Sequence, residues 1–391
     1  MKHLTQSPTD PAFVQNPYAF YEIARAAGPF FYWTDYGLTC TGNAAAVNAI
    51  FRDRRFGREV PPEKAPVIPD HLKPFYAVEA HSMLELEPPR HTRLRGLVLR
   101  AFTSRRIEAL RPEIETLSHQ LIDSFPPGPF DLLAHFGQKL PVIIIARLLG
   151  VPETMAPELL AWSNAMVGMY MAGRNRARED RAVAATEAFV AFLRDYVGRR
   201  RADPRDDLIT HLIAAEEDGE RLSTDELITT CILLLNAGHE ATVHALGNGV
   251  KTVLETGSQA ALLADPEVTL EEILRFDPPL HMFTRHAYED VEVMGTRFRR
   301  GDQVGLLLAM ANRDPGPWED PQIFDPRRPV RPNASFGAGL HFCVGAPLAR
   351  QELQIALPIL FRRLPDLALT EPPVYADVFH FHGLKRLMVK A

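Results

Sequence analysis

The feature that most limits how this chain can fold is helix-type patterning, which dominates from about residue 89 to residue 277. Residues 140–150 are apolar on nearly every side and stop at Gly150, as a buried helix would. Ser223 or Thr224 can cap a second long helix, which runs towards Val253. The pattern then changes to short strands and proline turns, and one more helix is expected after Pro347. We therefore predict a mainly α fold with a smaller β part.

The 33 prolines divide the chain unevenly, and the first 80 residues read as small strands and loops. Strand-like segments are expected at about 30–60 and 280–310, and the helical body at about 89–277 and 344–363. No repeat, low-complexity tract or linker interrupts the pattern. A chain of 391 residues can bury a large hydrophobic core without the help of disulfide bonds. We predict a single domain spanning residues 1–391.

Composition excludes several classes of protein. Apolar residues make up 46% and charged residues 24%, which excludes a disordered or collagen-like chain. Cys40, Cys231 and Cys343 form no C-x-x-C pair, which excludes a disulfide framework and fits a reducing compartment. A net charge of −6 argues against a nucleic-acid partner. Without an apolar leader or a run of about 18 apolar residues, we expect a cytoplasmic protein that has no membrane partner.

The segment from Phe336 to Arg350 carries the strongest chemical signal. Gly337, Gly339 and Gly345 surround Cys343, where the absence of Cβ atoms lets a flat ligand approach the backbone. A helix is expected to begin just after Cys343, and its N–H groups and dipole favour a thiolate there. A single thiolate suits the axial position of a haem. The alternative is a small buried hydrophobe, the common fate of an isolated cysteine, and the glycine spacing argues against it.

The segment FGAGLHFCVG at residues 336–345 resembles the F-G-x-G-x-[HR]-x-C-x-G loop of the cytochrome P-450 haem-thiolate monooxygenases. Glu272 and Arg275 match that family's E-x-x-R pair, and residues 237–242 (AGHEAT) resemble the centre of its oxygen-binding helix. With residues 89–95 near the front, the resemblance covers essentially the whole chain and looks like that of a soluble bacterial member. It implies a long central helix that passes over a haem.

The resemblance also implies a set of cofactor-binding residues. Cys343 would ligate the iron of haem b (iron protoporphyrin IX), and Phe336 would pack beside the sulfur. Buried propionates need paired donors, and the resemblance assigns this role to Arg95 and Arg285 among others. The alternative for these two arginines is that they are ordinary surface charges. The expected haem-binding residues are His91, Arg95, Ala237, Gly238, Arg285, Phe336, Gly337, His341, Cys343 and Gly345. In the family, the pair Glu272–Arg275 braces the fold and does no chemistry.

The oxygen-binding helix departs from the family pattern. The resemblance makes Glu240 and Thr242 the candidate catalytic residues, with Glu240 relaying protons through water. A structurally paired helix carboxylate is the alternative for Glu240. The family usually has threonine directly after the acid, whereas this chain has Ala241 there. One residue is about 100° around a helix, so Thr242 is expected to point away from the oxygen site.

The resemblance implies an enzyme that inserts one atom of O2 into an apolar small molecule, with electrons from a ferredoxin and its reductase. Seven arginines and only one acid lie from residue 90 to residue 111. This positive charge suits the docking of an acidic ferredoxin, and the alternative is that the arginines form a solvated helix face. A peroxide-driven haem-thiolate oxidase and a haem-binding sensor without turnover are the competing functions. The resemblance also implies a substrate pocket, and for each expected lining residue the alternative is a place in the hydrophobic core. The expected pocket residues are Phe75, Tyr76, Met83, Met166, Met169, Tyr170, Leu233, Asn236, His281, Phe283 and Phe381.

Overall fold

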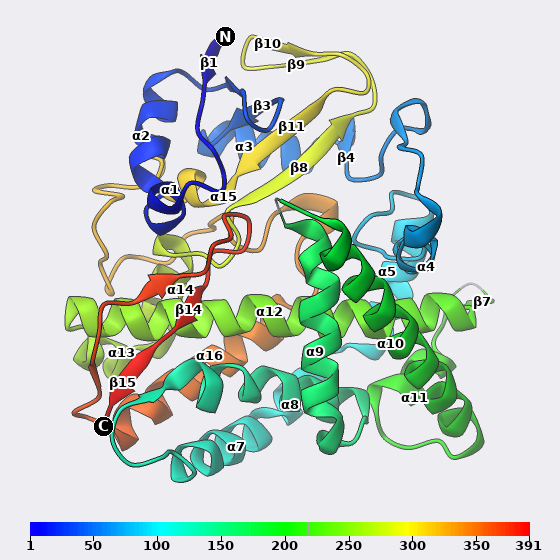
Figure 1. The fold of residues 1–391 in the computed structure, drawn as a ribbon, viewed down its shortest axis with the longest axis vertical. Helices are drawn as coiled ribbons and strands as arrows, with labels where there is room; N and C mark the ends of the chain where they lie inside the picture. The colour runs from blue at the N-terminus through cyan, green and yellow to red at the C-terminus, as the bar shows by residue number, and fades with distance from the viewer. Residues whose placement is uncertain (172, 218) are drawn as a thin grey trace.

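A single long helix, α12 (Thr224–Thr256), crosses the molecule, and the other layers pack around it (Figure 1). The computed structural model describes residues 1–171, 173–217 and 219–391. Ser223 caps α12 as predicted: its hydroxyl accepts from the N–H of Glu226 at 3.2 Å, and the Glu226 carboxylate accepts from the N–H of Ser223 at 2.9 Å. The helix ends at Gly257, which takes the left-handed conformation with φ 64°.

Helices form most of the described chain, which confirms the predicted mainly α fold. Their bounds are α1 (Pro11–Gln15), α2 (Tyr18–Ala26), α3 (Ala44–Arg52), α4 (Lys73–Glu79), α5 (Arg90–Ala101), α6 (Ser104–Ala109), α7 (Arg111–Asp123), α8 (Lys139–Leu149), α9 (Ala156–Val167), α10 (Arg176–Ala202), α11 (Leu208–Ala214), α13 (Gln259–Ala264), α14 (Pro266–Phe276), α15 (Leu308–Ala311) and α16 (Ala346–Arg363). Single 3₁₀ or π turns add Pro62–Lys64, Asp70–Leu72, Leu133–Gly137, Glu153–Met155, Gly168–Tyr170 and Gly339–His341. Helix α8 stops at Gly150 as predicted, with φ 83°.

The strands are short, and the largest sheet joins distant parts of the chain. Their bounds are β1 (Lys2–Leu4), β2 (Phe31–Trp33), β3 (Leu38–Thr41), β4 (Phe56–Gly57), β5 (Phe130–Asp131), β6 (Glu216–Glu217), β7 (Glu220–Arg221), β8 (Met282–Ala287), β9 (Val291–Val293), β10 (Thr296–Phe298), β11 (Gln303–Leu307), β12 (Ala368–Leu369), β13 (Val374–Tyr375), β14 (Leu384–Arg386) and β15 (Met388–Lys390). The main sheet has the order β1-β2-β3-β11-β8-β4, so the two predicted β segments pair with each other. Strand β11 is parallel to β3, with Val304 opposite Thr39, and antiparallel to β8.

The interpretation of the first 80 residues as strands and loops is wrong in part, because helices α1 to α4 lie there as well. Prolines that look like breakers in the sequence stand at helix starts, where a missing N–H costs nothing. Pro11 opens α1 behind the Asp10 cap, and a proline also lies in the first turn of α4. The Asn43 side chain caps α3 by accepting from the N–H of Ala46 at 3.0 Å.

The layers fix the place of the candidate site. Helix α12 packs against α8, α9, α10, α14 and α16. In Figure 1 the main sheet lies beyond α12 on the side of the N-terminus, and α7, α8 and α16 lie on the opposite side. The loop that carries Cys343 connects the two regions, since it follows the sheet in the chain and leads directly into α16.

Candidate active site

The loop around Cys343 has a backbone that only glycine allows. Gly337 and Gly339 take φ values of 67° and 69°, in the left-handed region. A Cβ on Gly339 would lie 2.1 Å from the carbonyl oxygen of Phe51, so a side chain would force α3 away from the loop. The N–H of Cys343 donates to the carbonyl of Phe336 at 3.0 Å and closes the loop before α16 begins. The predicted arrangement of glycines, cysteine and helix start is therefore present.

Burial and nearby positive charge act in opposite directions on the pKa of the Cys343 thiol. Burial raises the pKa of this thiol above its usual value, while the N–H groups of Gly345 and Ala346 and the charges of Arg95 and Arg350 lower it. In the polypeptide by itself burial has the larger effect on the pKa of this thiol, and a Cys343 thiolate stays a prediction. A metal ion at the sulfur would supply the missing positive charge, because a coordinating thiol loses its proton.

The proposed propionate partners gather beside this loop. The rings of His91 and His341 lie 4.4 Å apart, and Arg95 donates to the carbonyl of Phe342 at 2.8 Å. His91 is buried, and its Nδ1 has no hydrogen-bond partner within the described part of the chain. Burial, together with the charges of His341 and Arg95, lowers the pKa of His91 to about 4. The site therefore contains a buried polar atom that a bound group would have to satisfy.

Arg285 is the buried cation that best fits an anionic group of a ligand. Only 4% of the residue is exposed, and its guanidinium donates to the carbonyl of Thr284 at 2.8 Å and lies over the ring of Phe51. Among the described residues no carboxylate pairs with it. Burial and then the neighbouring charge of Arg58 lower its pKa to about 9. Since a buried cation without a counter-ion is costly, its position fits the acidic edge of a flat ligand.

The sequence missed Glu87, which holds His341 in place. The Nε2 atom of His341 lies 2.8 Å from the Glu87 carboxylate, which also accepts from the N–H of Arg58 at 2.7 Å. Burial acts to raise the pKa of Glu87, but these partners bring it below its usual range. The contact joins residues 254 positions apart, and no local pattern signals it.

Near the centre of α12, part of the helix surface is exposed although several other helices pack against this helix. Ala237 is exposed, and Ala241 lies one turn further along. Gly238 faces α8, because a Cβ at this position would lie 3.9 Å from the side chain of Ile145, an ordinary van der Waals distance. The exposed alanine edge fits a flat apolar group lying between α12 and the Cys343 loop.

The two candidate catalytic residues have different surroundings. The Thr242 hydroxyl is buried and donates to the carbonyl of Gly238 at 2.9 Å, so its proton is held by its own helix. Glu240 lies 3.3 Å from Nε2 of His244 and 3.8 Å from Nδ1 of His239. Burial acts to raise the pKa of Glu240, yet the two histidines bring it below its usual value. Glu240 is therefore a partly buried, ionised carboxylate that is linked to imidazoles.

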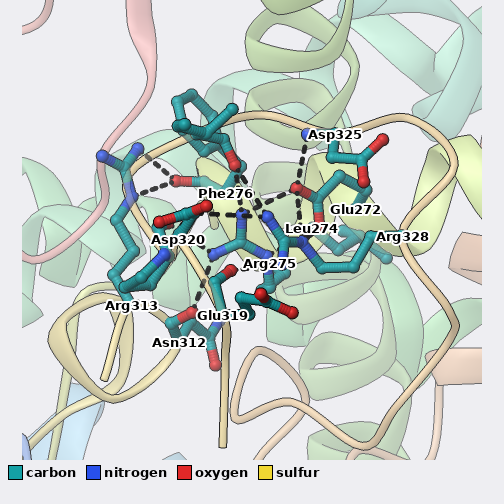
Figure 2. A network of polar contacts seen from close by, with 12 residues as sticks. Glu272, Leu274, Arg275, Phe276, Asn312, Arg313, Glu319, Asp320, Asp325 and Arg328 are labelled. Atoms are coloured by element: carbon teal, nitrogen blue, oxygen red, sulfur yellow. Dashed lines mark hydrogen bonds and ion pairs between the residues drawn. The ribbon is translucent and has the colours of Figure 1, made fainter. Parts of the chain in front are cut away.

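The E-x-x-R pair forms the brace that the resemblance implies (Figure 2). Arg275 donates to both oxygens of Glu272 at 2.7 Å and also to the carbonyls of Asn312, Pro321 and Ile323. The N–H of Asp325 and the Arg328 side chain complete the network around Glu272. Both members of the pair are buried, and they tie α14 to the segment that leads into the Cys343 loop.

The pocket candidates divide into two groups. Phe75 packs against Tyr76 and Tyr170, and the amide nitrogen of Asn236 lies 3.7 Å from the sulfur of Met166. His281 lies elsewhere: Nδ1 is 2.9 Å from the hydroxyl of Tyr21, within an aromatic cluster that includes Phe379. The sequence could not separate these groups, because apolar spacing is the same in a pocket and in a core.

Comparison with known proteins identifies the family. Residues 267–365 match the family model described as cytochrome P-450. The chain is 36% identical to the cytochrome P-450 monooxygenase PikC of Streptomyces venezuelae, over 97% of this chain and 92% of that protein. It is 34% identical to the biotin biosynthesis cytochrome P-450 of Bacillus subtilis strain 168, over 99% of each. This protein belongs to the cytochrome P-450 family.

Solved structures agree with that assignment. The structure of cytochrome P-450 BioI in complex with hexadec-9Z-enoic acid ligated acyl carrier protein superposes with a TM-score of 0.91 at 33% identity, covering 97% of this chain and 99% of that one. The Bacillus subtilis cytochrome P-450 PksS gives a TM-score of 0.88 at 32% identity. The protein is an oxidoreductase of the monooxygenase type, and haem is the cofactor of its family. Within the described ranges, no helix combines the length and the apolar character that a membrane crossing requires.

Proposed function

We propose that this chain, as one haem-thiolate domain over residues 1–391, holds haem b through Cys343 and inserts one atom of O2 into an apolar small molecule. When bound, the haem supplies the redox chemistry that activates oxygen. The observation that carries the proposal is the pair of buried groups beside the Cys343 loop, His91 Nδ1 without a hydrogen-bond partner and the Arg285 guanidinium without a carboxylate partner among the described residues. His341 and Arg95 lie next to them and would complete the binding of two carboxylates.

The proposed substrate is apolar because the candidate pocket residues from α4, α9 and α12 are mainly aromatic, thioether and aliphatic side chains. Met166 is almost wholly buried against Asn236, which would be a single polar contact in this wall. Relatives include one named vitamin D(3) 25-hydroxylase, from Pseudonocardia autotrophica, and one named 6-deoxyerythronolide B hydroxylase, from Saccharopolyspora erythraea. These names support hydroxylation of an organic molecule as the reaction.

The test compares electron sources with one substrate found by a spectral screen for displacement of the water on iron. With a ferredoxin, its reductase and NADH, we expect hydroxylated product in proportion to the oxygen consumed. Turnover with hydrogen peroxide alone would favour a peroxide-driven oxidase, for which Ala241 is the motivating residue. Ligand binding without product from either source would overturn the proposal in favour of a sensor.

We also propose that the electron donor is a ferredoxin that docks on the face formed by α5, α6 and α16. Arg105 of α6 is exposed there, and Phe342, next to the proposed ligand, is 40% exposed. A hollow of about 260 Å³ between α6 and α16 is lined by Arg111 and Arg350 among others. Part of the charge that the sequence counted is already paired, since Arg93 binds Glu226 and Arg111 binds Glu108. Arg90 and Arg106 also contact carboxylates, of Glu59 and Asp206, and the exposed Arg105 still suits an acidic partner.

Reversing one charge on this face should slow reduction without changing substrate binding. We expect Arg105→Glu to reduce the rate of electron transfer from ferredoxin, and the wild-type rate to fall with added salt, since exposed charges are screened over about 10 Å at 0.1 M ionic strength. Stopped-flow reduction under carbon monoxide measures the rate. Arg181→Glu, an exposed substitution on α10, is the matched control. Equal rates for Arg105→Glu and wild type at low salt would remove this docking face from the proposal.

A further inference from the structure

His244 lies one helical turn beyond Glu240 on α12, and neither the sequence motifs nor the family resemblance singles it out. We propose that His244 is a positioning residue that holds the Glu240 carboxylate and returns a proton to it in each turnover. The inference rests on the proposed monooxygenase function and deepens it, because it names the chain's own replacement for the threonine absent at position 241.

The geometry of the pair supports this role. His244 Nε2 lies 3.3 Å from Oε1 of Glu240, at the i,i+4 spacing that places both side chains on one helix face. Each side chain is only 14% exposed, so bulk water does not surround the contact. A protonated imidazole nitrogen at this distance from a carboxylate is held by charge attraction, which little water weakens in such a setting. His244 is therefore placed both to orient Glu240 and to supply its proton.

Hydroxyl groups cannot take this role in the same place. Position 241 is alanine, and the Thr242 hydroxyl donates to the carbonyl of Gly238 at 2.9 Å. The other neighbour, His239, is almost fully buried, and its Nδ1 lies 3.8 Å from Glu240. Burial lowers the pKa of His239 to about 4, so it stays neutral near pH 7. Among the described partners of Glu240, His244 makes the closer contact.

The other side of the His244 ring is closed by the C-terminal segment. A Cβ on Gly383 would lie 1.8 Å from His244 Nδ1, so the backbone at Gly383 fits directly against the imidazole. This Nδ1 is buried and has no hydrogen-bond partner within the described residues. His382, the residue before Gly383, is a second buried imidazole, and the charge of His244 acts on its pKa. The free ring nitrogen therefore faces the segment through which protons would have to arrive.

A row of ionisable groups continues from there to the surface. His382 Nε2 lies 3.8 Å from Asp277, whose other oxygen lies 3.2 Å from Lys251 Nζ. Lys251 in turn lies 3.3 Å from Glu255, which is 44% exposed near the end of α12. Asp277, His281 and His382 bring ligand atoms within 4.8 Å of one another. Because the Asp277 carboxylate is already paired with Lys251, the row suits proton passage better than a metal ion.

The proton balance is simple. Insertion of one oxygen atom consumes O2, two electrons from the donor and two protons, and it yields one hydroxylated product and one water. A proton that arrives at Nδ1 makes the ring an imidazolium, which passes its Nε2–H proton to Oε1 of the ionised Glu240, and Glu240 then delivers that proton towards the oxygen site. The ring is left neutral with its proton on Nδ1, and a half-turn of the ring about its Cβ–Cγ bond restores the starting state. The groups that face His244 are Glu240 and His239 on α12 and His382 in the C-terminal segment.

The first test is His244→Gln in the haem-loaded full chain, with the ferredoxin system and a substrate of the wild type. We expect product formed per NADH to fall at least about tenfold, within the range for lost acid–base assistance, with substrate affinity unchanged. The pH dependence of the coupled rate should flatten, and peroxide-supported turnover, which brings its own protons, should persist. His211→Gln breaks a comparable His–carboxylate pair, with Asp206 at 2.8 Å on the surface, and should change none of these.

A second readout does not depend on activity. In the reduced, carbon-monoxide-bound protein labelled with ¹⁵N-histidine, the ring resonance missing from His244→Gln should change its ¹⁵N chemical shift in Glu240→Gln, because the contact of Nε2 with the carboxylate is lost. An unchanged chemical shift, or unchanged coupling and pH profile in His244→Gln while the wild type makes product, would overturn the proposal for His244. Absence of product from the wild type with the ferredoxin system would instead overturn the proposed function, and this inference with it.

Discussion

Replacing Cys343 with serine should abolish the red-shifted Soret band of the reduced carbon-monoxide complex, the spectral mark of thiolate ligation. Serine keeps the size of the side chain but offers a hard alkoxide oxygen where a soft sulfur ligand is required. The loop itself should persist, because its N–H to Phe336 and its glycine conformations do not involve the sulfur. Difference spectra of the purified variant, reconstituted with haem, measure the effect.

Cys40→Ala is the matched control for that experiment. Cys40 is buried in strand β3, and burial raises the pKa of its thiol to about 12, so it is an inert side chain within the sheet. Its variant should keep the red-shifted band at full amplitude. A Cys343→Ser protein that retained the same band would mean that another residue ligates the iron, and the proposed site would have to be moved.

Replacing Glu240 with glutamine should slow oxygen activation by about 10²–10⁴-fold, the usual contribution of a general acid–base group. Glutamine keeps the shape of the side chain but can neither accept the proton of His244 nor pass one on. Product formed per NADH consumed, with one substrate held constant, measures the loss. Substrate affinity should change little, because the carboxylate is engaged with histidines of its own helix.

The variant Thr242→Ala tests whether the Glu240 carboxylate or the Thr242 hydroxyl is the catalytic group. Since the Thr242 hydroxyl donates to the carbonyl of Gly238, its removal should leave coupling close to that of the wild type. If Thr242→Ala uncoupled turnover as strongly as Glu240→Gln, the hydroxyl would be the catalytic group and the proposed role of Glu240 would fail. Ala241→Thr restores the common family pattern, and we expect it to intrude on space fitted to alanine, because a β-branched residue adds volume there.

The helix starts show how far local chemistry carries a prediction. The Ser223 cap with Glu226 and the stop of α8 at Gly150 depend on neighbouring residues alone, and both are present in the structure. The helices of the first 80 residues were missed because proline was interpreted as a breaker, although it stands at helix starts in α1 and α4. Proline permits both roles, and the flanking cap decides between them.

The candidate site divides in the same way. The sequence by itself determined the family, the glycine-lined loop, Cys343, and the order of the acid and alcohol on α12, because each is a short pattern of neighbouring residues. Only the tertiary structure decided that Arg285 is buried without a carboxylate partner and that Glu87 holds His341. It alone placed Gly383 against His244. These contacts join positions more than a hundred residues apart, and their energies depend on burial, which a chain acquires only when distant segments pack together.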